Sequence, residues 1–170
     1  MSLPIIHIIG LPGAGKTTLA RSLNKKFKIP IYGIGSYRAR FPMTTLGEAD
    51  AWLALFSDLS KRKWSNCVLE TTGLNVRENF LSRALPFDQM IIVKLEASRK
   101  MLLERIGQKR KSEQGGQWFY AQYQDKYDFV RKLYPNLKNI PSHINVKTDK
   151  MTKKEVFKHA LKRLMTYAVI

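Results

Sequence analysis

One eight-residue segment near the N-terminus restricts the possible folds of this chain more than any other. Residues 10–17 read Gly-Leu-Pro-Gly-Ala-Gly-Lys-Thr and fit the pattern G-x-x-x-x-G-K-[ST] at every position. The apolar residues 4–9 precede the segment, and Leu19, Leu23 and Phe27 follow it at helical spacing. The sequence therefore predicts a buried strand, a tight glycine-rich loop and a helix in direct succession.

Each residue type in this loop suits the binding of phosphate groups. The glycines let the backbone curl so that successive N–H groups point inward and form a nest for anionic oxygens. The helix that begins near Gly15 directs its unsatisfied N–H groups and the positive end of its dipole at the same place. Lys16 would add a full charge at the β- and γ-phosphates, and the Thr17 hydroxyl would bind Mg²⁺. The expected ATP-binding residues are Gly10, Leu11, Pro12, Gly13, Ala14, Gly15, Lys16, Thr17 and Thr18.

The rest of the chain alternates short apolar runs with stretches of helical periodicity. Further strands are predicted at residues 29–34, 67–70, 90–95 and 142–146, and helices at 46–63, 76–85, 98–108, 118–134 and after Thr152. Two pairs, Thr45 with Glu48 and Thr152 with Glu155, have the spacing of a capping box. Strands that are apolar on both faces require a parallel sheet covered on both sides. We expect an α/β protein of three layers, with residues 1–170 forming a single domain.

The strand, the loop at residues 10–18 and this layout resemble the P-loop nucleoside and nucleotide kinase superfamily. The small metabolite kinases and the polynucleotide-kinase-like proteins resemble it most. The likeness spans the chain in layout, and it is specific only at the loop. It implies the P-loop NTPase fold with a five-stranded parallel sheet, a mobile lid over ATP, the use of Mg²⁺, and phosphoryl transfer to a small acceptor.

Glu70 ends the third predicted strand, where related kinases often carry an acidic residue before a glycine-containing turn. In parallel sheets the carboxyl ends of the strands share one edge, so Glu70 would face the γ-phosphate. There it would serve as a second metal-binding residue beside Thr17, or accept the proton of an attacking hydroxyl. The alternative is a strand-end glutamate that faces solvent.

The acceptor side departs from the family pattern. An acidic residue is expected after the second strand, yet residues 33–40 read Gly-Ile-Gly-Ser-Tyr-Arg-Ala-Arg. Unless Glu70 acts as the base, this favours an acceptor that is already ionised, such as a nucleotide or a phosphorylated substrate. The expected acceptor-binding residues are Arg38, Arg77 and Gly73, with Arg40 and Arg83 nearby. For each arginine, a solvated surface position is the alternative.

A lid is expected at about residues 105–117, with an irregular loop from Lys109. By position, the resemblance implies that Arg105 and Arg110 cover the adenine or reach the transferring phosphoryl group, and we count both as catalytic candidates with Lys16 and Glu70. The alternative is an exposed basic loop. Aromatic residues in the following segment, residues 118–134, either pack in the core at a spacing of three or four or stack on single-stranded nucleic acid.

The charge of the chain favours polyanionic ligands. The 30 Lys and Arg residues against 13 Asp and Glu residues give a net charge of +17, which suits nucleotides, nucleic acid or an acidic membrane face, or simply a solvated basic surface. No run of about 20 apolar residues is present, and the lone Cys67 suits a reducing compartment as a small buried residue. We expect a cytoplasmic protein without a membrane partner, and the sequence leaves the oligomeric state open.

Three functions from different classes follow. The first is a kinase that uses ATP and Mg²⁺ to phosphorylate a small anionic metabolite, nucleoside or nucleotide. The second is a kinase or ATPase acting on a nucleic-acid end, which the charge and the aromatic segment favour; nucleic acid is the less expected partner. The third is a nucleotide-binding module without turnover, which the missing acid after the second strand favours.

Overall fold

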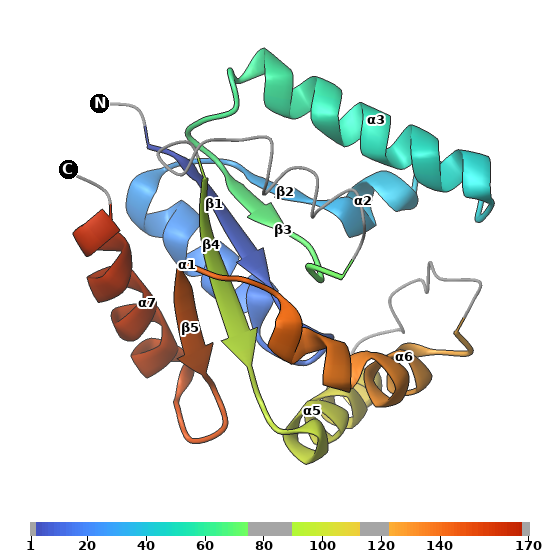
Figure 1. Ribbon diagram of the computed structural model, residues 1–170, viewed down its shortest axis with the longest axis vertical. Helices are drawn as coiled ribbons and strands as arrows, with labels where there is room; N and C mark the ends of the chain where they lie inside the picture. Colours follow the sequence, from blue (N-terminus) through green and yellow to red (C-terminus); the bar gives the residue numbers. More distant parts are fainter. Residues whose placement is uncertain (1–2, 75–89, 113–122, 168–170) are drawn as a thin grey trace.

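The computed structural model describes residues 3–74, 90–112 and 123–167, which form a parallel sheet with helices on both faces. The strands are β1 (Ile5–Ile9), β2 (Ile31–Gly33), β3 (Val68–Glu70), β4 (Met90–Glu96) and β5 (Ile144–Lys147), in the order β2-β3-β1-β4-β5 (Figure 1). Every pair of neighbouring strands is parallel. This confirms the predicted α/β class and the five-stranded parallel sheet.

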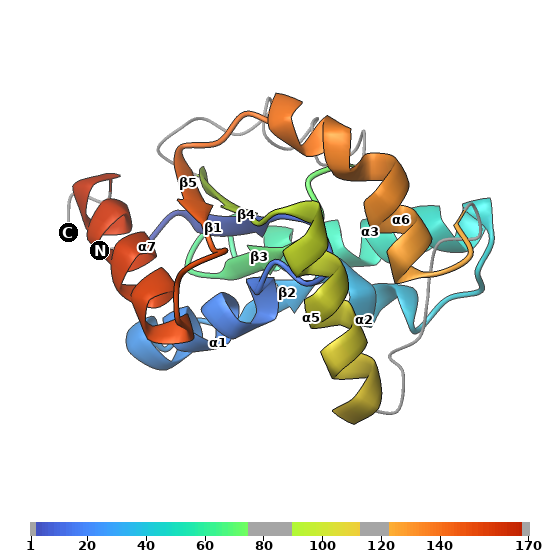
Figure 2. The same cartoon turned by 90° about the horizontal axis from the view of Figure 1, so that it is seen from below.

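The alternation of side chains along β1 divides the core into two layers. Ile6 and Ile8 belong to a buried cluster with residues of α1 (Lys16–Phe27) and α7 (Lys153–Tyr167). Ile5 and Ile9 point to the other face, where they join residues of α2 (Ile34–Arg38) and α3 (Thr45–Lys61). Successive residues of a strand face opposite sides of a sheet, so one fully buried strand supports both layers. Figure 2 shows α1 and α7 together beside the sheet.

The helix starts depend on which side chain caps the first turn. The Thr152–Glu155 capping box is confirmed, because the Thr152 N–H donates to Glu155 Oε2 at 2.7 Å and the Glu155 N–H donates to Thr152 Oγ1 at 3.3 Å. The Thr45–Glu48 box is wrong. Thr44 caps α3 instead, accepting from the Gly47 N–H at 3.0 Å. The Glu48 side chain therefore does not cap α3, and it contacts Arg38.

Two further expectations about helices are wrong in their boundaries. Helix α5 (Arg99–Ser112) continues through the residues expected to begin an irregular loop at Lys109. The helix expected at 118–134 begins, in the described part, only with α6 (Lys126–Leu133), and a 3₁₀ helix (Tyr134–Asn139) follows it. The Asp125 side chain accepts from the Tyr127 and Asp128 N–H groups at 2.8 and 3.0 Å. This N-cap stops the helix from extending toward the N-terminus.

The new start of α6 also changes which of its side chains are buried. Phe129 and Val130 are the buried residues of this helix, and Tyr123, outside it, packs edge-on against Phe129 with ring centroids 4.9 Å apart. The described aromatic residues of this segment thus follow the core interpretation rather than the stacking one. The expected helix at 76–85 lies outside the described residues. Among the helices that the structure describes, none has the length and apolar character needed to cross a membrane.

Candidate active site

The predicted phosphate loop connects β1 to α1 at the carboxyl edge of the sheet. Its backbone adopts positive φ at Gly10, Gly13 and Gly15. At Gly13, where φ is 85°, a Cβ atom would lie 2.7 Å from the carbonyl oxygen of Leu102 in α5. Any side chain at this position would therefore force the loop away from α5 as well as strain its backbone. The sequence thus fixes both the curl of the loop and its close contact with α5.

The Lys16 side chain folds back across this loop. Its Nζ donates to the Leu11 carbonyl oxygen at 3.2 Å, so the ammonium lies against the loop backbone. The helix that starts at Lys16 has Gly15 as its N-cap, with no side chain that accepts from the first N–H groups. Those N–H groups and the ammonium together produce a site for anionic oxygens.

Thr17 and Glu70 meet beside the loop. Thr17 Oγ1 donates to Glu70 Oε1 at 2.6 Å, and Glu70 is the last residue of β3, the strand next to β1. Glu70 is half-buried, so the alternative of a glutamate facing bulk solvent is not what the structure shows. A hydroxyl and a carboxylate in contact supply the hard oxygen ligands that Mg²⁺ prefers, and the expected pair of metal-binding residues is therefore brought together.

The turn after β3 is attached to the same loop. The Gly10 N–H donates to the Thr72 carbonyl oxygen at 3.3 Å. Gly73 has φ 80°, and a Cβ atom there would lie 2.9 Å from the Ile9 Cβ. The Gly73 N–H donates to Thr71 Oγ1 at 3.2 Å. Gly73 thus has a clear packing role at the site's edge, and its expected contact with an acceptor stays a prediction.

His7, in β1, contacts this turn through Thr71, and no pattern in the sequence indicates this contact. Its Nε2 is 2.7 Å from Thr71 Oγ1, and its Nδ1 has no hydrogen-bond partner among the described residues. Burial lowers the pKa of His7 from 6.5 to about 3, so the ring is neutral at physiological pH. A neutral ring supports Thr71 without adding charge near the phosphate loop.

Arg105 joins the phosphate loop to the turn after β5, and its expected roles in a lid and in catalysis stay predictions. Its Nη1 donates to Thr148 Oγ1 at 2.9 Å and to the Gly13 carbonyl oxygen at 3.4 Å, and its Nη2 donates to the Thr148 carbonyl oxygen at 2.7 Å. Thr148 follows β5 and is buried. The exposed-loop alternative is therefore wrong for Arg105, which lies on helix α5 and fixes the turn after β5 against the phosphate loop.

Arg38 is buried and ion-paired. Its Nε donates to Glu48 Oε2 at 2.7 Å and its Nη2 to Glu48 Oε1 at 2.6 Å, and Trp52 Nε1 also donates to Glu48 Oε1, at 2.8 Å. The Arg38 side chain is 5% exposed and that of Glu48 27%. A solvated surface position is therefore excluded for Arg38. Its acceptor role stays a prediction, which now requires the acceptor to approach a guanidinium that already contacts a carboxylate.

Several expected site residues fall where the structure says nothing of their side chains. Arg77 and Arg83 lie outside the described residues, and Arg110 lies in the last part of α5, where only the helical backbone is described. Over the described ranges, no group of three or more His, Cys, Asp or Glu residues could hold a metal ion. The role of Thr17 and Glu70 as metal-binding residues stays a prediction.

Comparisons with known proteins find the fold but no near relative. No protein-family model matches the sequence, and a search of curated proteins gave no match. Shikimate kinase from Acinetobacter baumannii in complex with shikimate is similar at TM-score 0.67 and 17% identity, over 99% of this chain and 96% of that chain. A gluconokinase from Sinorhizobium meliloti 1021 is similar at TM-score 0.63 and 16% identity, over 97% and 93%.

A third similar structure is part of a larger complex. One chain of the Pnkp1/Rnl/Hen1 RNA repair complex is similar at TM-score 0.64 and 15% identity, over 82% of this chain and 45% of that chain. The chain therefore has the fold of P-loop kinases, as its resemblance at residues 10–18 implied.

Proposed function

We propose that this protein is a kinase that uses ATP and Mg²⁺ to phosphorylate a small anionic metabolite, nucleoside or nucleotide. The observation that carries the proposal is the Thr17–Glu70 contact of 2.6 Å beside a glycine loop fitted for phosphate. One edge of the parallel sheet carries all of these groups: the glycine loop, the N-terminus of α1, the Lys16 ammonium, the Thr17 hydroxyl and the Glu70 carboxylate. Similar structures that are kinases for shikimate and gluconate support a small acceptor.

Each residue has a physical task in this proposal. The loop N–H groups and Lys16 bind the β- and γ-phosphates, since fixed positive groups stabilise charge that spreads over the transferring group. Thr17 and Glu70 would hold Mg²⁺, which neutralises phosphate charge when bound. Glu70 has two possible tasks, to orient a metal-bound water or to accept the acceptor's proton. An acceptor that is already ionised needs only the first.

A second candidate is a kinase acting on a nucleic-acid end. The net charge of +17 and the similarity to a chain of an RNA repair complex favour it. The electrostatic attraction of so basic a protein to nucleic acid is independent of sequence and strong at low salt. For either candidate we propose a cytoplasmic location, which the free, buried thiol of Cys67 suits.

One panel of acceptors separates these functions. Purified protein with Mg²⁺ and ATP is offered sugar acids, shikimate, nucleosides, nucleoside monophosphates and an oligonucleotide with a free 5′-hydroxyl, and ADP formation is measured. We expect stimulation above the rate with water by one small-molecule class. Stimulation by the oligonucleotide alone would favour the second candidate. If the wild-type protein binds ATP but forms ADP no faster with any acceptor than with water, and no faster than Lys16→Ala does, both kinase proposals would be contradicted.

A further inference from the structure

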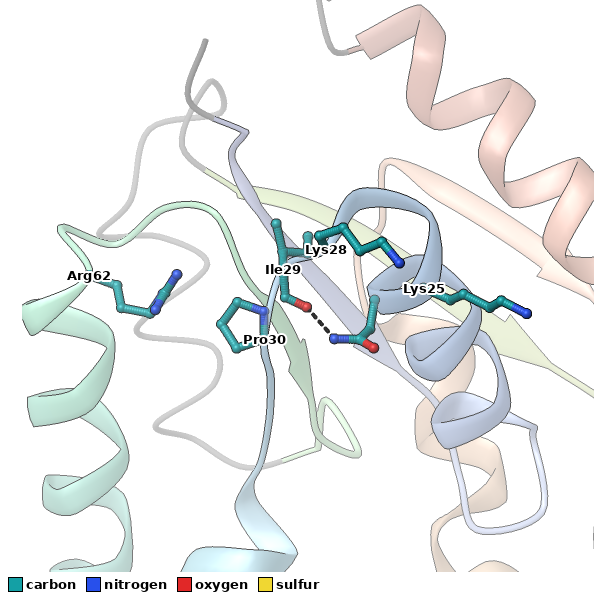
Figure 3. A pocket seen from close by; sticks show the side chains of 6 residues that line it. Lys25, Lys28, Ile29, Pro30 and Arg62 are labelled. Atoms are coloured by element: carbon teal, nitrogen blue, oxygen red, sulfur yellow. Dashed lines mark hydrogen bonds between the residues drawn. The ribbon is translucent and has the colours of Figure 1, made fainter.

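A hollow lies at the edge of the sheet opposite the phosphate loop. It has a volume of about 650 Å³ and is lined by Asn24, Lys25, Lys28, Ile29, Pro30 and Arg62 (Figure 3). We call these six residues the basic hollow. Helix α1 runs from Lys16 to Phe27 and rises about 1.5 Å per residue, so the lining residues from Asn24 to Lys28 lie about 12 to 18 Å along the helix from the loop at its start. The hollow is therefore not part of the ATP site.

The hollow is cationic because two helix ends meet there. Lys25 and Lys28 come from the end of α1, Arg62 follows α3, and all three side chains are exposed. In the sequence, neither residues 19–33 nor residues 59–67 contain an Asp or Glu. The carboxylate of Asp58, in the last turns of α3, pairs with Lys61 at 3.1 Å. Among the described residues, no carboxylate pairs with Lys25, Lys28 or Arg62, so their charge can act on a ligand.

The backbone near the hollow is left-handed at four described residues other than glycine, namely Lys28, Lys63, Trp64 and Asn66. Lys28 is the C-cap of α1 at φ 58°, and Lys63, just past the end of α3, has φ 53°. Helices commonly end with a residue in this left-handed conformation, and glycine is the residue that adopts it without steric cost. The chain carries lysine at both helix ends instead. Neutralising the helix dipoles does not require it, because Lys25, Lys26 and Lys61 already lie in the last turns.

The form of the hollow favours an extended polyanion over a small anion. Its three cations are exposed and belong to long, flexible side chains, whereas enclosed sites for small ligands place polar groups inside a deep pocket. Figure 3 shows Pro30 between Arg62 and the two lysines, so the charges border an apolar floor of Ile29 and Pro30. None of the six lining residues is aromatic, so base stacking, as in single-strand binding, has no platform there.

We propose that the basic hollow binds the phosphodiester backbone of a nucleic-acid duplex without reading its sequence. The excess of basic residues over the whole chain, +17, supplies long-range attraction, and the hollow supplies the contact. The inference does not rest on the proposed kinase activity, because the phosphate loop lies at the other edge of the sheet. A duplex bound here leaves the ATP site accessible.

The test measures binding of a mixed-sequence duplex of about 20 base pairs by fluorescence anisotropy between about 50 and 200 mM salt. The triple variant Lys25→Gln, Lys28→Gln, Arg62→Gln is compared with Lys154→Gln, Lys158→Gln, Lys162→Gln, which removes the same charge from exposed positions of α7. Each lost phosphate contact reduces the slope of log affinity against log salt by about 0.9. We expect the first variant to lose about 2–3 from the slope and at least about tenfold in affinity, and the second to change much less.

A second pair of variants separates folding from binding. Lys28→Gly and Lys63→Gly each remove the steric cost of a side chain on a left-handed backbone, so each variant is expected to keep the Tm of the wild type or to raise it by about 2–4 °C. Lys28→Gly is nonetheless expected to weaken duplex binding, since Lys28 lines the hollow. Unchanged duplex binding by both Lys28→Gly and the hollow triple variant would overturn the proposal.

Three further outcomes would overturn it. Equal losses in the two triple variants would mean that only overall charge matters. Competition by saturating Mg²⁺-ATP would place the duplex at the phosphate loop. Binding of phosphatidylserine vesicles that depends on the hollow, with no binding of duplex, would assign the surface to a membrane. Retained duplex binding in Lys16→Ala, whatever its activity, would support the proposal even where the kinase function fails.

Discussion

The hydroxyl of Thr17 and the carboxylate of Glu70 come from positions 53 residues apart and lie 2.6 Å from each other. Thr17 stands in the first turn of α1 and Glu70 at the end of β3. The contact exists because β1 and β3 are neighbours in the sheet and their carboxyl ends coincide. If this pair holds the metal, substitutions at the two residues should change different kinetic quantities.

Glu70→Gln is expected to lower kcat by about 10² to 10⁴ if Glu70 accepts a proton, with little change in ATP affinity. A loss of less than about tenfold would indicate an ionised acceptor, and an unchanged kcat would place Glu70 outside the site.

Thr17→Val is expected to raise the Mg²⁺ concentration needed for half-maximal rate, while Thr17→Ser, which keeps the hydroxyl, should not. Steady-state kinetics over a Mg²⁺ titration measures both effects.

Lys16→Ala is expected to lower kcat by a factor of at least about 10² and to weaken ATP binding. The fold should survive, because Lys16 contacts the loop carbonyl of Leu11 and is not part of the hydrophobic core. ATP titration, ADP formation and circular dichroism together make the check. Near-normal activity with a native spectrum would show that the loop does not bind the phosphates of ATP.

The Arg105 contacts predict an effect on KM more than on kcat. Arg105→Lys keeps the charge but cannot donate to both Thr148 oxygens and to Gly13 at once. We expect the KM for ATP to rise about tenfold, the equivalent of about 1.4 kcal/mol, because the two loops that it joins lose their fixed spacing. Thr148→Val, which removes one of the contacts, should have a smaller effect of the same kind. A fall in kcat above about 100-fold at constant KM would instead support the catalytic role expected from the sequence.

The Arg38–Glu48 pair predicts unequal losses of stability. Glu48→Gln leaves Arg38, only 5% exposed, without an opposing charge, and is expected to lower the free energy of unfolding by about 3 kcal/mol. Arg38→Met leaves a carboxylate that is 27% exposed and that water can reach, so the expected loss is smaller, about 1–2 kcal/mol. Urea unfolding of both variants and of the double variant measures the coupling. Additive losses would contradict a direct interaction.

His7 predicts that the protein loses stability in mild acid. Its pKa is about 3 in the folded state against 6.5 ordinarily. Below pH 6.5 the unfolded chain therefore binds a proton that the folded chain does not, and the free energy of unfolding falls by up to about 1.4 kcal/mol per pH unit. Half-buried His143, whose pKa burial also lowers, acts in the same direction. Urea unfolding at pH 7, 6 and 5 should show this fall, and a clearly shallower one for His7→Asn.

The sequence predicts best what depends on neighbouring residues. The loop at residues 10–18 and the five strands follow from local patterns, since glycine spacing and apolar runs act within a few positions. Glu70 was identified because a strand end in a parallel sheet has a known edge. The Thr152–Glu155 capping box is a local signal too, and the structure contains it.

Where several local signals compete, the sequence does not say which one decides. At residues 44–48 both threonines could cap α3, and the choice of Thr44 leaves Glu48 for Arg38. In residues 118–134 the aromatic spacing favours one long helix, but in the described part the Asp125 N-cap makes α6 begin at Lys126. The contacts of Arg105 with Thr148 and of His7 with Thr71 join distant elements, 43 and 64 residues apart. No periodicity within either segment indicates such contacts.

The position of β1 has a consequence for synthesis on the ribosome. Among the described strands this one is synthesised before the others, yet it is the central strand, and its neighbours β3 and β4 come from residues 68–70 and 90–96. Thr148, which Arg105 joins to the phosphate loop, comes later still. A nascent chain therefore carries the entire loop long before it can hold that loop in shape. Ribosome-bound chains that stop before Thr148 should not retain ATP, although they already contain the whole loop of residues 10–18.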